Sequence, residues 1–192
     1  MDYQEVLDFW FLPPASAAYG AIRGEWFKKN DAFDAEIRAR FGEQVEQAVA
    51  GGLREWDAAG AQGVLARILV LDQFTRNTLR DTPGAFGGDA LALAAARQLA
   101  DSGADQALLP VQRWFAYMPF EHAEDGAMQA RSVELFTALA EHDPQFAGAL
   151  DYAHRHRGVI ARFGRFPHRN AILGRASSPE ELAYLSQPGS GF

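Results

Sequence analysis

The chain has 192 residues, of which 48% are hydrophobic and 22% are charged, and its formal net charge at pH 7 is −7. This composition is that of one globular domain, and it excludes a chain that is disordered by default. Cysteine is absent, which excludes a disulfide framework, a thiolate nucleophile and a cysteine-based zinc or iron–sulfur site. The negative charge argues against sequence-independent binding to nucleic acid.

The first predicted element is a short helix with its core at Val6–Phe11, and Pro13-Pro14 ends it. The sequence Met-Asp-Tyr-Gln-Glu that precedes this core lacks the basic and apolar regions of a secretory signal. No apolar run approaches the roughly 20 residues that a membrane span requires. We therefore expect a single domain over residues 1–192, cytoplasmic and without a membrane partner.

The second predicted helix has an apolar residue at every fourth position, at Phe33, Ile37, Phe41, Val45 and Val49. Asn30 or Asp31 is suited to cap its start, and Gly51-Gly52 ends it. Residues 61–79 follow, and they are apolar on almost every side. A helix without a polar face belongs in the middle of a bundle.

The second half of the chain repeats the helical pattern after a loop over residues 81–88, which is rich in glycine and proline. A capping box at Ser178-Pro179-Glu180-Glu181 begins the last predicted helix. Residues 187–192 look like a frayed tail, and no run of alternating residues predicts a strand. The predicted helical segments are 89–100, 111–117, 122–141 and 144–160, followed by the one that Ser178 begins. We predict one all-α domain of about seven to nine helices, arranged as antiparallel helical hairpins.

Two polar side chains interrupt the most apolar helix. Asp72 and Arg76 are four residues apart, so both fall on one stripe of that helix. A desolvated charge there must be partnered. Either the two form a buried ion pair that fixes helix register, or they line a binding pocket.

A second cluster is Glu121-His122-Ala123-Glu124-Asp125, which we expect to open a helix. Acidic residues in a first turn complement the helix dipole, which is the simpler interpretation. His122 and Asp125 are three residues apart, and Glu121 and Asp125 are four apart, so these spacings also permit an acid–base pair or two metal ligands. On the acid–base hypothesis Glu121 and His122 are candidate catalytic residues.

The third cluster contains His154 and His156, which lie about 200° apart on a helix and therefore cannot chelate one ion. Asp151 and His154 are better spaced, but two ligands fall short of the three or four that zinc needs. We predict no metal site, and the sequence identifies no cofactor.

The fourth cluster is an arginine-rich loop. Between Tyr152 and Arg175 there are six arginines and no acidic residue. Guanidinium groups suit the planar recognition of carboxylate or phosphate, although they can equally bind the acidic remainder of the chain. The candidate ligand-binding residues of this loop are Arg162, Arg165, Arg169 and Asn170, and His168 is a further candidate acid or base.

These segments resemble a known bacterial family. The resemblance rests on Asp8-Phe-Trp-Phe11, Trp26-Phe27, Leu71-Asp72-Gln73-Phe74 with Arg76-Asn77, Glu121-His122 with Glu124, Arg162-Phe-Gly-Arg-Phe-Pro-His-Arg-Asn170 and Leu173-Gly174-Arg175. The chain is similar over most of its length to the family called domain of unknown function 924. The resemblance implies a tetratricopeptide-like all-α fold, and it implies no activity or catalytic residue.

Two functions therefore stay open. The first is an enzyme or binding protein in which the polar clusters form a pocket for a small anionic ligand and use general acid–base chemistry. The second is a tetratricopeptide-like module that binds an acidic peptide in a groove. A homodimer is compatible with both.

Overall fold

The computed structural model describes residues 2–191, and these residues form helices and loops without any strand. The predicted all-α class is therefore confirmed. The nine α-helices of the described residues are α1 (Tyr3–Phe11), α2 (Asp31–Val49), α3 (Ala61–Leu69), α4 (Thr75–Thr78), α5 (Asp89–Asp101), α6 (Pro110–Glu121), α7 (Gly126–His142), α8 (Ala147–Phe163) and α9 (Pro179–Leu185). Short 3₁₀ turns occur at Gly24–Phe27, Arg54–Ala59, Pro83–Phe86, Ala104–Ala107, Pro144–Phe146 and Pro167–Arg169.

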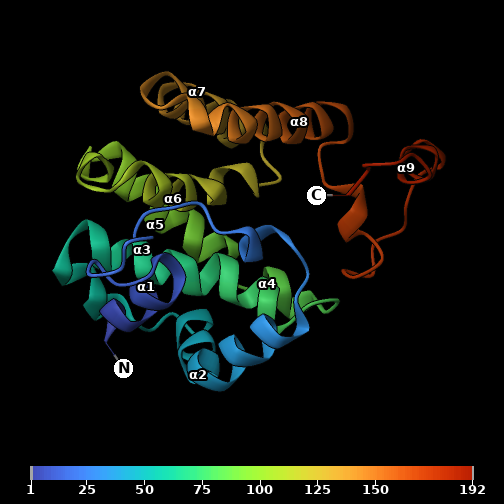
Figure 1. The fold of residues 1–192 in the computed structure, drawn as a ribbon. Helices are drawn as coiled ribbons and strands as arrows, with labels where there is room; N and C mark the ends of the chain where they lie inside the picture. The colour runs from blue at the N-terminus through green and yellow to red at the C-terminus, as the bar shows by residue number, and fades with distance from the viewer. Residues whose placement is uncertain (1, 192) are drawn as a thin grey trace.

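Helix α3 lies at the centre of the domain, as its apolar sequence predicts. It packs against α1, α5 and α6, while α2 packs against the segment that continues α3 (Figure 1). Leu65, Ile68 and Leu69 of α3 are completely buried. An aromatic cluster beside α3 joins α1 to α6 through Trp10 and Phe115, whose ring centroids are 5.4 Å apart.

Helices α6, α7 and α8 follow one another through short connections and pack pairwise, with α7 and α8 in a layer over α6 (Figure 1). After α8 the chain leaves this layer and forms a C-terminal segment that carries α9. A small hydrophobic cluster joins this segment to the end of α8: Val159 and Ile160 of α8 pack with Phe166, and Phe163 and Tyr184 pack against them. Ion pairs supply much of the segment's remaining attachment.

The predicted central helix, residues 61–79, is not one regular α-helix. A π-helical turn, Val70–Phe74, separates α3 from α4 and places Asp72 at its centre. The wider turn disturbs the regular backbone ladder. Side chains bind its carbonyl groups instead: Thr75 Oγ1 donates to Leu71 O over 2.9 Å, and Arg76 Nη1 donates to Asp72 O over 2.8 Å.

The helix predicted over residues 122–141 begins four residues later than its acidic run indicates. Asp125 is the N-cap, and its side chain accepts a hydrogen bond from Met128 N over 2.9 Å. His122 instead ends the preceding helix, where it is the C-cap of α6. The expectation that Glu121 and His122 open a helix was therefore wrong, because α6 extends four residues beyond the segment predicted to end at Tyr117.

Other local predictions are confirmed. Asn30 caps α2 through Ala32 N and Phe33 N, and Ser178 forms the capping box of α9 with Glu181. Residues 187–191 lie beyond α9, whereas Phe192, the last residue of the predicted tail, lies outside the described residues. None of the helices within residues 2–191 has the length and hydrophobicity to cross a membrane.

Candidate functional site

The centre of the site is a carboxylate–imidazole pair. Asp72 Oδ1 lies 2.6 Å from His122 Nδ1, with the Asp72 side chain 1% exposed and that of His122 12% exposed. Gln73 Nε2 donates to the other carboxylate oxygen of Asp72 over 2.6 Å. Because an ionised carboxylate only accepts hydrogen bonds, the Asp72–His122 bond requires the proton on Nδ1. In a neutral ring the other nitrogen, Nε2, then carries no proton and can accept a hydrogen bond.

His122 is held by the end of its own helix. The last carbonyl groups of an α-helix have no partner within the helix. Gln129, a fully buried residue of α7, donates from Nε2 to Glu121 O over 2.7 Å and to Ala123 O over 2.8 Å. Arg169 Nη2 donates to His122 O over 3.1 Å. These bonds fix the backbone on both sides of the imidazole.

A partly buried ion-pair network extends the site on the side of α5. Arg76 makes a bidentate pair with Asp89, over 2.8 Å and 3.0 Å, and its Nη1 lies 3.2 Å from Asp72 Oδ1. Arg169 Nη1 donates to the same Asp89 carboxylate over 3.3 Å. The network thus joins the π-helical turn, the first turn of α5 and the C-terminal segment.

Gly88 allows this close approach. It is the N-cap of α5, and a Cβ atom added to it would lie 2.1 Å from the carbonyl oxygen of Leu71 in the π-helical turn. No real side chain tolerates that distance, so only glycine brings Asp89 within reach of Arg76.

A cavity of about 430 Å³ opens beside these groups. Its polar walls are Asp89, His122, Glu124, Asp125 and Arg169. Its apolar walls include Phe86, Leu93, Pro119 and Leu173. The volume lies in the range of small-molecule sites, and a mostly apolar lining with a few convergent polar groups is typical of them.

Electrostatics keep Asp72 ionised and His122 neutral. Burial alone would raise the pKa of Asp72, but the charge of Arg76 and the hydrogen bonds from His122 and Gln73 outweigh it, so the pKa lies well below its usual range. Burial and the neighbouring Arg76 charge lower the pKa of His122. A neutral imidazole that lines a cavity is chemically a base.

Two further predicted site residues, Glu121 and His168, do not line the larger cavity. Glu121 is buried and its Oε1 lies 2.8 Å from His156 Nδ1, so it orients His156 and makes no bond to His122. His168 lies beside Phe166, with the ring centroids 5.6 Å apart. Burial and the charge of Arg169 lower the pKa of His168 to about 4.

The arginine-rich loop pairs with carboxylates of its own chain. Arg162 and Arg165 bind Glu180 and Glu181 of α9, and Arg175 forms a bidentate pair with Glu124 over 2.6 Å and 2.9 Å. Asn170 binds Ser177 and Arg175. Of the predicted ligand-binding residues in this loop, Arg169 alone lines the cavity beside His122.

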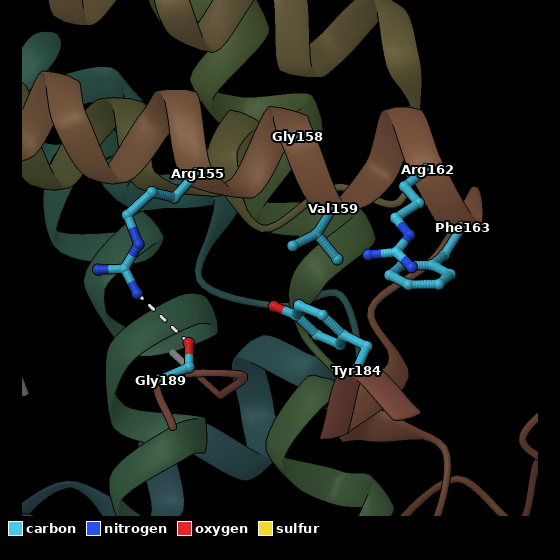
Figure 2. Close-up of a pocket in the computed structure, with 7 residues that line it drawn as sticks. All are labelled: Arg155, Gly158, Val159, Arg162, Phe163, Tyr184 and Gly189. Atoms are coloured by element: carbon cyan, nitrogen blue, oxygen red, sulfur yellow. Dashed lines mark hydrogen bonds between the residues drawn. The ribbon is translucent and has the colours of Figure 1, made fainter. Parts of the chain in front are cut away.

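A second cavity, of about 330 Å³, lies between α8 and the C-terminal segment. Figure 2 shows Arg155 and Arg162 reaching into it from α8, with Tyr184 on the other side. The guanidinium of Arg162 binds Glu180, and Arg155 donates to Gly189 O over 3.4 Å. This cavity contains neither a buried acid nor a histidine, so we place the functional site at the larger one.

Metal ligands do not converge at either cavity: among residues 2–191 no group of three acidic or histidine side chains is arranged to hold an ion. Three contributors to the larger site were missed from the sequence. Asp89 looks like an ordinary acid in a first helical turn, while Gln129 and Phe86 carry no local signal.

Comparison with known proteins identifies the chain by family. Residues 6–189 match the family described as "Bacterial protein of unknown function (DUF924)". A solved structure of a protein of unknown function from Agrobacterium tumefaciens is 38% identical, covers 96% of each chain and superposes with a TM-score of 0.83. No curated protein matches the chain.

Proposed function

Because the chain belongs to this bacterial family, domain of unknown function 924, whose description names no activity, we propose a function from the site itself. The protein binds a small anionic ligand in the cavity beside His122 and removes a proton from it, or from a water molecule next to it, by general-base catalysis. The observation that carries this proposal is the buried Asp72–His122 pair, 2.6 Å long, at the wall of a cavity.

His122 Nε2 is the atom that accepts the proton. Its lowered pKa keeps the imidazole neutral at pH 7, so the base is present in its active form. When Nε2 is protonated the ring becomes a cation, and the ionised Asp72 at Nδ1 stabilises it. Asp72 is thus a positioning residue, and Arg76 and Gln73 hold it ionised.

Arg169 supports the binding of an anion. It is the one cationic side chain among the described residues that line the cavity. Its side chain is 8% exposed, and burial together with the charge of Arg76 lowers its pKa to about 10. An incoming anion would offset this unfavourable environment. Arg162, Arg165, Asn170, Glu121 and His168 act in this proposal by fixing the segment that carries Arg169 and the helix end that carries His122.

The second function, a tetratricopeptide-like module for acidic peptides, draws support from the consecutive packing of α6, α7 and α8. Its arginines would have to exchange their internal carboxylate partners for those of a peptide. The same experiment separates the two functions.

Thermal melting against carboxylates, phosphate esters and short acidic peptides tests the proposal. A ligand at a hundred times its dissociation constant adds about 2.7 kcal/mol of stability, and each kcal/mol raises Tm by roughly 2–4 °C in a domain of this size. We expect a shift with a small anion, abolished by Ala90→Trp, which fills the cavity from the surface of α5. Ala35→Trp, on the exposed surface of α2, is the matched control.

His122→Gln tests the chemistry separately. This variant should keep ligand binding and lose turnover of whichever ligand the wild-type chain converts. Shifts with acidic peptides alone, unchanged by Ala90→Trp, would contradict the proposal and support the peptide module.

A further inference from the structure

Arg169 has hydrogen-bonding capacity that the protein does not use. A guanidinium carries five N–H bonds, and within residues 2–191 those of Arg169 reach two acceptors, Asp89 Oδ2 and His122 O. Its Nε is buried and has no hydrogen-bond partner. An unsatisfied buried donor costs free energy, and the cost is larger for a charged group. Because Arg169 lines the larger cavity, an anion bound there would offset part of the cost of burying its charge.

The acidic residues of the cavity would gain less free energy from binding a cationic ligand than Arg169 would gain from binding an anion. Glu124 already accepts from Arg175 and from Phe166 N, and Asp89 accepts from Arg76 and Arg169. Asp125 caps α7 and is exposed, so water solvates its carboxylate. An exposed ion pair contributes little. An amine at Asp125 would therefore add less than an anion at the buried Arg169.

The number of charges on that anion is restricted. The carboxylates of Asp89, Glu124 and Asp125 line the same cavity, against the single guanidinium of Arg169. A second negative charge on the ligand would be repelled by these carboxylates without meeting a second cation. One negative charge in a planar group matches the planar edge of a guanidinium.

Beyond Arg169, a ligand in this cavity would contact apolar side chains. Phe86, Leu93, Pro119 and Leu173 supply the apolar wall. The ring of Phe86 also lies 4.7 Å from the guanidinium carbon of Arg169, so the charged and apolar parts of the cavity adjoin. Covering this wall favours binding by roughly 25 cal/mol for each Å² of apolar surface removed from water.

We propose that the ligand is a monocarboxylic acid with an apolar body, whose carboxylate binds Arg169 and whose hydrocarbon covers Phe86, Leu93, Pro119 and Leu173. This inference rests on the proposed function, since it names the class of anion that the same cavity receives. It disfavours phosphate esters and amines as ligands.

Three probes with alkyl chains of similar length test the chemical class of the ligand: hexanoate, hexyl phosphate and hexylamine. Acetate is a fourth probe, which has the carboxylate but lacks the apolar chain. Dissociation constants are measured by NMR titration of the full-length chain, monitoring the arginine Nε–H signals. We expect hexanoate to bind at least tenfold more tightly than each of the other three probes. Arg169→Gln identifies the Arg169 signal and should remove the preference for the carboxylate.

If Arg169→Gln does not fold, Ala90→Trp still tests the proposal, because this variant leaves the ion-pair network intact. It should abolish hexanoate binding, while Ala35→Trp should not. Tighter binding of hexyl phosphate in the cavity would overturn the carboxylate class and leave the proposed binding of a small anion standing. Tighter binding of hexylamine would overturn both. Absence of hexanoate binding, or binding that survives Ala90→Trp, would also overturn the inference.

Discussion

Asp72 and His122 are 50 residues apart in the chain, and a 2.6 Å hydrogen bond joins their buried side chains. The bond connects the π-helical turn to the end of α6, and the larger cavity opens beside it. Stability, proton affinity and ligand binding therefore depend on one small set of contacts, and each dependence can be measured.

Asp72→Asn removes the charge that Arg76 and His122 share. Removing one partner of a buried ion pair costs about 3–5 kcal/mol, so a clear fall in the free energy of unfolding by urea is expected. The control is Glu36→Gln in the exposed pair of Arg40 and Glu36, whose side chains are 46% and 52% exposed. That change should cost less than about 1 kcal/mol, and equal losses in both variants would refute the burial argument.

Gly88→Ala places a Cβ atom against the carbonyl oxygen of Leu71 and must push α5 away from the π-helical turn. We expect lower stability and a weakened Arg76–Asp89 pair, visible as a changed arginine Nε–H signal. Gly42→Ala in α2 has open space around its Cβ. This control should stabilise the helix by about 0.5–1 kcal/mol. A Gly88→Ala variant with unchanged stability would show that α5 and the π-helical turn are not tightly packed.

Acid should destabilise the chain through its buried histidines. Burial and neighbouring charges lower the pKa of His168 to about 4 and also lower that of His122. Between about pH 6.5 and pH 4 the unfolded chain binds protons that the folded chain does not, so stability falls as pH falls. Urea unfolding at several pH values should show this slope, and His168→Gln should make it shallower by up to one proton. The same pH dependence of stability in His168→Gln and in the wild type would mean that burial does not lower the pKa of His168.

Gln73→Leu leaves one oxygen of the Asp72 carboxylate without its hydrogen bond. We expect a higher pKa for Asp72 and a His122 imidazole that no longer holds one tautomer, both observable by NMR. Gln112→Leu is the matched control, since Gln112 is another buried glutamine and bonds to Gln62 and Tyr19 rather than to the site. The same histidine spectrum in Gln73→Leu and wild type would show that Gln73 does not position Asp72.

Local features of the fold were predictable because local chemistry determines them. The caps at Asn30 and Ser178 follow from side chains that bind main-chain N–H groups within three residues. The apolar faces of residues 61–69 identify the central helix. The spacing of Asp72 and Arg76 indicated a charged stripe in a buried helix, and the structure shows the ion pair between them. Neither residue lines either cavity, and the two reach the larger one only through their partners His122 and Asp89.

The other features of the site depend on tertiary contacts, which the spacing of residues along the sequence does not specify. Asp89 completes the Arg76 pair only because Gly88 packs against a distant carbonyl group. The acidic run before α7 gave the wrong partner for His122, since α6 extends to Glu121 and presents His122 to Asp72 instead. The arginine-rich loop gave three arginines as candidate ligand-binding residues, Arg162, Arg165 and Arg169, and only the folded chain shows which acids they bind.

The measurement that tests the central claim most directly is the tautomer and charge of His122 at pH 7, read from the ring nitrogen shifts of histidine-labelled protein. The chain has five histidines, and the His122→Gln spectrum assigns the signal. We predict a neutral ring with the proton on Nδ1 and a bare Nε2. A ring protonated on both nitrogens at pH 7, or a neutral ring with the proton on Nε2, would contradict general-base catalysis by His122.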